Sequence, residues 1–203
     1  MAARGRLTKE LRECKRSEES SGVTVEALES SSLNHLRATM QGPSDSVFEG
    51  GVFVLDVQIP EEYPFEPPKV KFLTKVWHPN VSSQTGAICL DILKDAWTPA
   101  MSLTTTLLSI SALLTAAEPD DPQDAVVATQ YKADRALYDQ TAKFWTEMYA
   151  APAMAASPRL SDDDEVKVAA LVDMGFDADQ VREVLRMNGG DQARAMEVLL
   201  SGG

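Results

Sequence analysis

Cys89 and Asn80 are the two residues of this chain whose types and spacing could carry out chemistry together. Cys89 follows the tripeptide His78-Pro79-Asn80 by nine residues. A thiol can hold an acyl group as a thioester, and an asparagine amide can donate to the oxyanion that forms when an amine attacks that thioester. The pair therefore points to acyl transfer rather than to hydrolysis.

The residues before Cys89 predict that its side chain is reachable from solvent. Gly86 and the polar run 82–85 have the composition of a loop. A buried structural cysteine is the ordinary alternative for an isolated thiol. Cys14, by contrast, is expected on the buried face of a helix.

Other kinds of cysteine site lack the residues that they need. A cysteine hydrolase requires a histidine base beside the thiol, and the chain has only His35 and His78. His35 falls in a predicted strand. The two histidines and Cys89 do not have the spacing of zinc ligands. No glycine-rich phosphate loop is present, so we expect neither a metal nor a nucleotide cofactor.

Several motifs in roughly the first 150 residues resemble those of the ubiquitin-conjugating enzymes, in the same order and at similar spacing. They are the segment 86–91 around Cys89, His78-Pro79-Asn80, Tyr63-Pro64-Phe65-Glu66-Pro67-Pro68, Trp97, Pro119-Asp120-Asp121-Pro122 and Phe144-Trp145. The resemblance implies that Cys89 accepts ubiquitin from an activating enzyme as a thioester and passes it to a lysine amine. It also implies that ATP is used only by the activating enzyme, and that His78 packs inward as a structural hydrogen-bonding residue.

The resemblance assigns further residues to the reaction. Asn80 either stabilises the oxyanion or holds the Cys89 loop in place. Asp121, with Asp120 beside it, matches acidic residues that flank the entrance for the acceptor lysine, where a carboxylate can orient the amine and assist loss of its proton. The alternative for Asp121 is a helix N-terminal cap after Pro122. Asp91 matches another family position near the site.

Two loops and the N-terminal helix are expected to receive protein partners. A proline-stiffened loop with an apolar tip makes a rigid anchor at low entropic cost. Residues 1–16 are rich in lysine and arginine, which indicates either a solvated helix face or a docking surface for an acidic partner. By resemblance, the positions that contact ligases or the activating enzyme are Pro64, Phe65, Pro99, Ala100, Arg6 and Lys9.

Length, charge and cysteine content limit the class of protein. With 203 residues, the chain suits one larger and one small domain. The net charge of −12 argues against general nucleic-acid binding. We expect no signal peptide and no membrane span. Two cysteines make a poor disulfide framework, which favours a reducing compartment, the cytosol or the nucleus.

Hydrophobic periodicity in the first domain predicts strands first and helices afterwards. Residues 4–18 read as an amphipathic helix with Leu7, Leu11 and Cys14 inward and its charges outward. Antiparallel strands are expected at 23–28, 33–40, 51–59 and 69–73, and then an apolar helix at 103–114 capped by Ser102. Two helices follow, at 124–131 and at 135–149, the second with Leu137, Phe144, Trp145 and Met148 inward. This pattern predicts an α+β domain, the ubiquitin-conjugating fold.

The C-terminal part reads as a linker followed by a three-helix bundle. We expect a catalytic domain at 1–152, a linker at 153–162 and the bundle at 163–203, with helices at 166–174, 179–187 and 191–200. Asp177 and Gln180 are spaced as a capping box. The bundle resembles a ubiquitin-associated domain, which implies non-covalent ubiquitin binding through Met174, Gly175, Phe176 and Leu199. Phe176 could instead belong to the bundle core.

The whole arrangement resembles the chain-building ubiquitin-conjugating enzymes that carry a C-terminal ubiquitin-associated domain. The partners that this implies are ubiquitin, an activating enzyme, ligases and lysine-bearing substrates, with no nucleic acid and no membrane. The residues alone do not separate ubiquitin from a ubiquitin-like modifier. The competing interpretation is a non-catalytic adaptor that uses the same fold, although adaptors of that kind lack the cysteine that this chain keeps.

Overall fold

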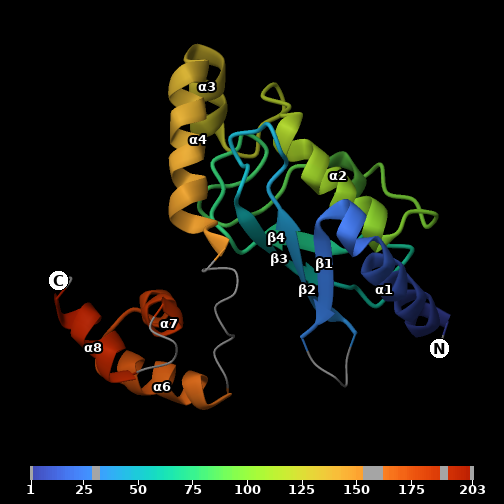
Figure 1. The fold of residues 1–203 in the computed structure, drawn as a ribbon. Coiled ribbons are helices and arrows are strands. Elements are labelled where there is room, and N and C mark those ends of the chain that lie inside the picture. Colours follow the sequence, from blue (N-terminus) through green and yellow to red (C-terminus); the bar gives the residue numbers. More distant parts are fainter. Residues whose placement is uncertain (1, 29–32, 153–161, 188–191, 202–203) are drawn as a thin grey trace. The chain divides into compact units, whose positions relative to one another are not determined.

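The computed structural model describes residues 2–28, 33–152, 162–187 and 192–201 (Figure 1). The chain divides into two compact units, Met1–Ala155 and Ala156–Gly203. Most of the expected linker, at 153–161, lies outside the described residues. Among the described residues, no helix is long and apolar enough to cross a membrane.

The first unit is built on a four-stranded antiparallel sheet in the order β1-β2-β3-β4. Each expected strand is present within two residues of its predicted ends. Strand β3 differs from simple alternation because six of its seven residues are buried. It is an inner strand and is covered on both faces. The strands are β1 (Val23–Ala27), β2 (His35–Gln41), β3 (Val52–Gln58) and β4 (Lys69–Phe72).

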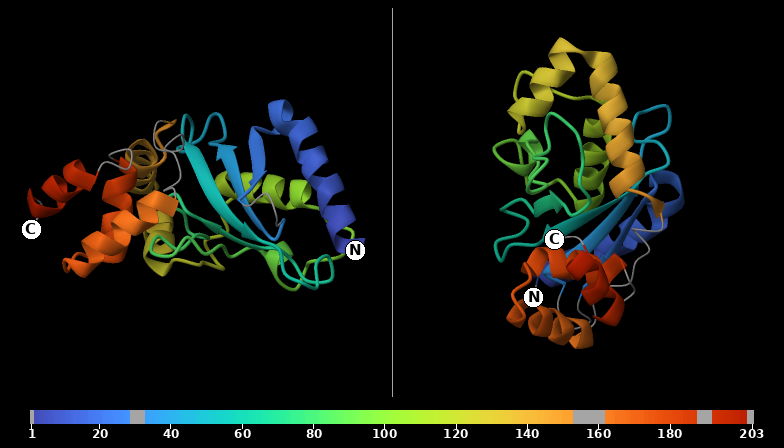
Figure 2. Two further views of the ribbon diagram at one scale, coloured as in Figure 1. Left: turned by 90° about the horizontal axis from the view of Figure 1, so that it is seen from below. Right: turned by 90° about the vertical axis from the view of Figure 1, so that its left-hand side faces the viewer.

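Helices α1 and α2 lie beside the sheet, whereas α3 and α4 extend beyond it (Figure 2). Ser102 caps α2 by accepting from the Thr105 N–H, and the Thr105 hydroxyl accepts from the Ser102 N–H in return. Asp124 caps α3 by accepting from two N–H groups of its first turn. The helices are α1 (Ala2–Ser21), α2 (Leu103–Thr115), α3 (Ala125–Ala133) and α4 (Arg135–Tyr149), with a short 3-10 turn η1 at Asp91–Leu93.

The predicted inward face of α4 is wrong. Leu137, Phe144 and Met148 are each about half exposed, and Trp145 is only partly buried. The buried residues of this helix are Tyr138, Ala142 and Thr146. Tyr138 fills space in the core, and Ala142 is small enough to let the helix approach closely. The Thr146 hydroxyl donates to the Ala142 carbonyl, which satisfies its polar group without leaving the helix.

The prediction that the charges of α1 face outward fails at Glu10. Its carboxylate is buried and accepts from the Arg6 side chain, the Tyr63 hydroxyl and the Leu103 N–H. These partners lie on three separate segments. A buried carboxylate is tolerated only when it is paired in this way, so Glu10 ties α1 to the loop before β4 and to the start of α2.

The second unit is a bundle of three helices, α6 (Asp162–Asp173), α7 (Ala178–Met187) and α8 (Gln192–Ser201). Helix α6 begins at Asp162, four residues before the predicted residue 166. The Asp177 carboxylate accepts from the Gln180 N–H, as the capping pattern predicts. The buried core contains Val168, Leu171, Val181, Val184, Leu185, Ala195 and Leu199.

Candidate active site

Cys89 lies on the irregular segment between β4 and η1, and its backbone is fixed to the segment that carries Asn80. The Cys89 N–H donates to the Asn80 carbonyl over 2.9 Å. Gly86 brings this segment close to β4: its φ is +73°, and a Cβ there would lie 1.9 Å from the Phe72 carbonyl oxygen. Only glycine fits such a position. The Cys89 side chain remains partly exposed.

Two charged side chains contact the Cys89 sulfur. The Lys94 Nζ lies 3.3 Å from Sγ, and the thiol faces the Asp121 Oδ2 at 3.8 Å. Asp121 comes from the segment between α2 and α3, 32 residues along the chain. The structure therefore brings Cys89 and Asp121 together. It also adds Lys94, which no local pattern singles out, because the irregular turn at η1 sets the direction of its side chain.

The Asn80 side chain is buried and already has its hydrogen bonds. Its Nδ2 donates to the carbonyls of Glu118 and Asp121, over 2.9 and 3.0 Å, and its Oδ1 accepts from the Glu118 N–H over 2.8 Å. The backbone carbonyl of Asn80 also accepts from the Cys89 N–H, so Asn80 links the Cys89 segment to the Asp121 segment. In this conformation both amide hydrogens are occupied, so the geometry favours the positioning role over the oxyanion role.

The neighbouring carboxylates have separate partners. Asp120 is paired with Lys132 over 2.7 Å and is strongly exposed. The helix cap that was the alternative for Asp121 is supplied by Asp124, which also accepts from the N–H and hydroxyl of Ser83. Burial would raise the pKa of Asp124, but these hydrogen bonds hold it below its ordinary value. The carboxylate of Asp91 accepts from the Ile92 N–H at the start of η1.

Neither histidine is placed beside the thiol as a base. His78 is fully buried, its Nδ1 accepts from the Asn80 N–H, and burial lowers its pKa to about 4. It is the inward-facing structural residue that the family resemblance implies. His35 pairs with Asp56 on the sheet. The hydrolase interpretation therefore lacks its base in the structure as well as in the sequence.

Cys14, the second cysteine of the chain, lies inside the fold. It is buried, its sulfur contacts the Thr104 hydroxyl at 3.2 Å, and burial raises the pKa of the thiol above its ordinary value. A thiol of this kind is a poor nucleophile. The prediction that Cys14 belongs to the buried stripe of α1 is confirmed.

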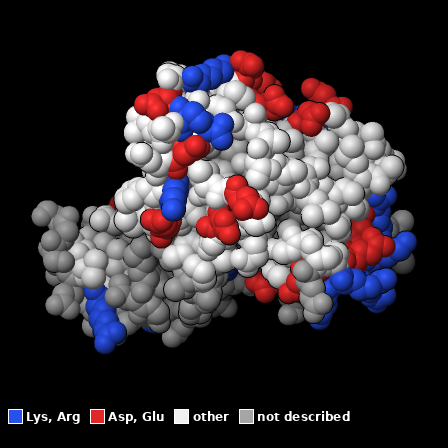
Figure 3. All heavy atoms as spheres, turned by 45° about the horizontal axis from the view of Figure 1, so that its top comes forward, with Lys and Arg blue, Asp and Glu red and all other residues white. Residues whose placement is uncertain are grey.

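The expected docking residues come from α1 and from two loops, and hydrogen bonds join these segments. Phe65 is about three-quarters exposed, and Pro99 and Ala100 are exposed as well. Lys9 is open to solvent, whereas Arg6 is held by Glu10 and by the Met101 carbonyl. The Trp97 indole donates to the Pro64 carbonyl, which joins the two loops. In Figure 3, basic side chains gather at the lower right of the view with acidic side chains beside them, and other basic and acidic side chains are spread over the rest of this face.

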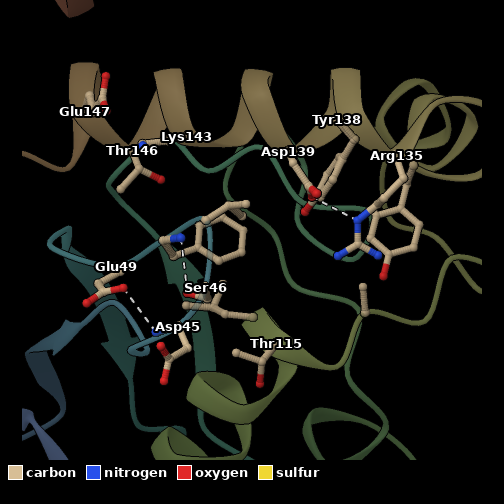
Figure 4. A pocket seen from close by; sticks show the side chains of 15 residues that line it. Asp45, Ser46, Glu49, Thr115, Arg135, Tyr138, Asp139, Lys143, Thr146 and Glu147 are labelled. Atoms are coloured by element: carbon tan, nitrogen blue, oxygen red, sulfur yellow. Dashed lines mark hydrogen bonds and ion pairs between the residues drawn. The ribbon is translucent and has the colours of Figure 1, made fainter.

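A cavity of about 580 Å³ lies apart from the thiol, between α4, the end of α2 and the loop after β2 (Figure 4). Arg135, Tyr138 and Asp139 project into it from α4, opposite Asp45 and Glu49. Cys89, Asn80 and Asp121 are not among its lining residues. The Cys89 thiol is partly exposed and lies outside this cavity.

In the bundle, the four predicted ubiquitin contacts fall into two groups. Met174 is exposed, and Gly175 adopts a φ of +99° in the turn after α6. Glycine adopts such a positive φ without the steric cost that a side chain would bring. Phe176 is half-buried against the bundle core, and Leu199 is buried within it. The assignment of Leu199 as a surface contact is therefore wrong, because its side chain packs between the helices.

Comparison with known proteins gives the family. The ubiquitin-conjugating enzyme family matches residues 6–146, and the UBA/TS-N domain matches residues 164–199. The chain belongs to the ubiquitin-conjugating enzyme family. It is similar to ubiquitin-conjugating enzyme E2 27 of Arabidopsis thaliana, with 50% identity over 97% of both chains, and to ubiquitin-conjugating enzyme E2 K of Homo sapiens, with 49% identity over 97% of this chain and 96% of the relative.

Solved structures agree with this assignment. The E2 domain of a Toxoplasma gondii ubiquitin-conjugating enzyme is 48% identical to this chain with a TM-score of 0.69. The match covers 72% of this chain and 98% of the Toxoplasma domain. The chain is therefore a ubiquitin transferase that works through a thioester, with a C-terminal ubiquitin-associated domain. Nothing in these matches favours the adaptor interpretation. Among the described residues, no group of three or more His, Cys, Asp or Glu side chains is placed to hold a metal ion.

Proposed function

We propose that Cys89 carries the ubiquitin thioester and that a lysine amine attacks it from the side of Asp121. The observation that supports this most directly is the partly exposed Cys89 sulfur 3.8 Å from the Asp121 carboxylate. The carboxylate can accept a hydrogen bond from the incoming ammonium group and orient it as it loses a proton. Attack forms the amide bond and breaks the bond between the carbonyl carbon and Sγ.

Asn80 acts in this proposal by keeping the Asp121 segment against the Cys89 segment. Its three side-chain bonds cross 38 and 41 residues of sequence. Because the reacting groups must be held within a narrow range of distances, a small shift of either segment slows the reaction. Asp120 remains outside this arrangement, since it is paired with Lys132 at the surface.

The activating enzyme and ligases bind the surface made by Lys9, Phe65, Pro99 and Ala100. The exposed apolar ring of Phe65 supplies an anchor on a loop that Trp97 and the Glu10 network hold in place. Arg6 contributes mainly by shaping this surface, because its guanidinium is already bonded to Glu10 and Met101.

The bundle binds a second ubiquitin through Met174 and Gly175, with Phe176 supporting the turn from below. An exposed methionine on a tight turn offers an adaptable apolar contact. Holding an acceptor ubiquitin on the same chain raises its local concentration, so the product is a ubiquitin chain rather than only a single modification. The cellular compartment that we propose is the cytosol or the nucleus.

A thioester assay tests the central proposal. Full-length protein is incubated with activating enzyme, ATP and ubiquitin, and the adduct is read with and without reductant. Wild type should give an adduct that reductant removes, whereas Cys89→Ser should give an ester that survives it, because a hydroxyl forms a less reactive acyl bond. Cys14→Ser should behave as wild type. An adduct that maps to Cys14 would overturn the assignment.

A further inference from the structure

Lys94 lies closer to the Cys89 sulfur than Asp121 does, although the proposed attack of the amine uses only Asp121. Its Nζ is 3.3 Å from Sγ, compared with 3.8 Å for the Asp121 oxygen. The sulfur thus has a cation on one side and an anion on the other. The side chains of Lys94 and Asp121 come from different segments, so their positions relative to the sulfur are fixed separately.

The turn at η1 determines where Lys94 points. The Lys94 N–H donates to the Asp91 carbonyl over 2.9 Å, and the Ala96 N–H donates to the same oxygen over 3.1 Å. These two bonds close the chain back toward Cys89. The ammonium group therefore approaches the sulfur because the backbone turns there, and not only because a long side chain can reach it.

We propose that Lys94 is a catalytic residue that stabilises negative charge on the Cys89 sulfur, both when the thiol is loaded and when it is discharged. The proposal rests on the assignment of Cys89 as the thioester residue. A neighbouring ammonium group lowers the energy of a thiolate by direct Coulomb attraction. The effect is moderate and salt-dependent because Lys94 is exposed.

The two steps involve the same charged sulfur. In loading, the Cys89 thiolate attacks the carbonyl carbon of ubiquitin held on the activating enzyme, and the bond from that carbon to the enzyme's sulfur breaks. In discharge, the lysine nitrogen attacks the same carbon and the electron pair of the broken bond returns to Sγ. The proton released by the amine goes to water or to the Asp121 carboxylate.

Lys94 and Asp121 should therefore have opposite signatures. A carboxylate beside the sulfur repels a thiolate, so Asp121 assists only the incoming amine and therefore only discharge. A cation beside the sulfur assists every step in which the thiolate forms or leaves. Loss of Lys94 is thus expected to slow loading and discharge together, whereas loss of Asp121 slows discharge alone.

Alkylation of the free thiol tests Lys94 without ubiquitin or any partner. Full-length wild type, Lys94→Gln, Lys94→Arg and Lys143→Gln are treated with iodoacetamide at pH 7 and low ionic strength, and modification is followed on the Cys89 peptide. Lys143→Gln is the matched control, because it removes the same charge from an exposed position on α4. The Lys94 side chain is also exposed, so its replacement leaves the core intact.

Lys94→Gln should be alkylated about three to ten times more slowly than wild type, while Lys94→Arg and Lys143→Gln stay within about twofold. Half-molar salt should narrow the gap between wild type and Lys94→Gln. Equal rates for these two proteins at low salt would overturn the proposal, and so would an arginine variant as slow as the glutamine variant.

Single-turnover loading and discharge to free lysine complete the test. Lys94→Gln should be slowed in both steps by a similar factor, and Lys94→Arg should retain most of the activity. If Lys94 itself becomes acylated and Lys94→Arg discharges faster than wild type, Lys94 is a competing acceptor and the proposal fails. If the alkylation result holds but no thioester forms on Cys89, the proposed function fails while the Lys94 contact stands.

Discussion

The two units of this protein prepare a surface for ubiquitin in different ways. In the catalytic unit, the reacting groups come from distant segments, and Asn80 joins them through bonds that cross 38 and 41 residues. In the bundle, the turn at Met174 and Gly175 is closed by local bonds to the carbonyls of Leu171 and Val172. A substitution at such a residue of the first unit should therefore displace more than one segment, whereas a substitution in the turn of the second unit should affect only that turn.

Replacing Asn80 should give the largest effect, because it breaks the hydrogen bonds that join the Cys89 segment to the Asp121 segment. Asn80→Ala leaves two carbonyls and one N–H without partners, which should lower the free energy of unfolding by about 2 to 3 kcal/mol. Loading should be nearly normal, but discharge to free lysine should fall by about 100-fold. Urea unfolding and single-turnover discharge measure the two effects.

The isosteric variant sharpens this result. Asn80→Asp keeps an oxygen where Oδ1 accepts from Glu118 N–H, but it replaces the donor to the two carbonyls. It should also discharge slowly. Wild-type discharge by both Asn80 variants would show that the link between the two segments is not needed for the reaction.

Acid should weaken the catalytic unit and spare the bundle, because both histidines of the chain lie in the first unit. Burial depresses the pKa of His78 from its ordinary value near 6.5 to about 4, so the unfolded state binds this proton first as the pH falls. The stability that the neutral ring contributes is present above pH 6.5 and is lost toward pH 4, by about 3 kcal/mol.

Urea unfolding at pH 7.5 and pH 4.5, followed by tryptophan fluorescence, measures this loss. All three tryptophans lie before residue 156, so the signal reports only the catalytic unit. His78→Gln, which has no ring to protonate, should lose less stability over the same range. An equal loss in the two proteins would mean that other groups are responsible.

Removing the Asp121 carboxylate should give a smaller effect that is confined to one step. Asp121→Asn should load no more slowly than wild type, because a charge that repels the thiolate is removed, and it should discharge to lysine about 30-fold more slowly, because the incoming amine loses its acceptor. Asp120→Asn is the matched control, since its carboxylate is exposed and paired with Lys132; it should stay within about twofold. A loading defect in Asp121→Asn would instead indicate that the segment has moved.

Deleting the bundle should give the smallest effect and leave the chemistry unchanged. A protein that ends at residue 158 should form the thioester and discharge to free lysine normally, because each unit has its own core. Formation of ubiquitin chains should fall by about three- to tenfold, because the second binding site is lost. Slower discharge to free lysine in the shortened protein would contradict the separation of the two units.

Two single substitutions test the local character of the bundle. Met174→Ala should weaken ubiquitin binding without changing the stability of the bundle, because its side chain is exposed. Leu199→Ala should destabilise the bundle by about 2 to 4 kcal/mol, because it leaves a cavity in the core. Titration of labelled ubiquitin, together with thermal unfolding, separates the two outcomes.

Periodic and capping signals in the sequence predicted most of the fold. The strands follow runs of apolar and β-branched residues between turn signals, and Ser102 and Asp177 cap helices where their spacing indicates. These features depend on near neighbours in the chain. The predicted inward face of α4 is wrong because this helix carries two competing stripes, one of apolar residues and one formed by Tyr138, Ala142 and Thr146. Which stripe is buried depends on the segments that pack against the helix.

The candidate site was predicted in its residue types but not in its contacts. Cys89 and Asp121 meet as the family resemblance implies. Other contacts depend on irregular turns or on partners far along the chain. They are the hydrogen bonds of the Asn80 amide, the contact of Lys94 with the Cys89 sulfur, and the burial of Glu10 and Leu199. Local sequence patterns carry no information about such contacts.

The bonds that join residues 79 and 80 to the segment before α3 also set the order in which the site can be completed during synthesis. The Pro79 carbonyl accepts from the N–H groups of Gln123 and Asp124, in addition to the bonds made by Asn80. A nascent chain that has emerged only as far as α2 already contains Cys89 but lacks these partners. Incomplete chains therefore contain the thiol without the finished site, and the groups that serve discharge come together only after the segment before α3 has been made.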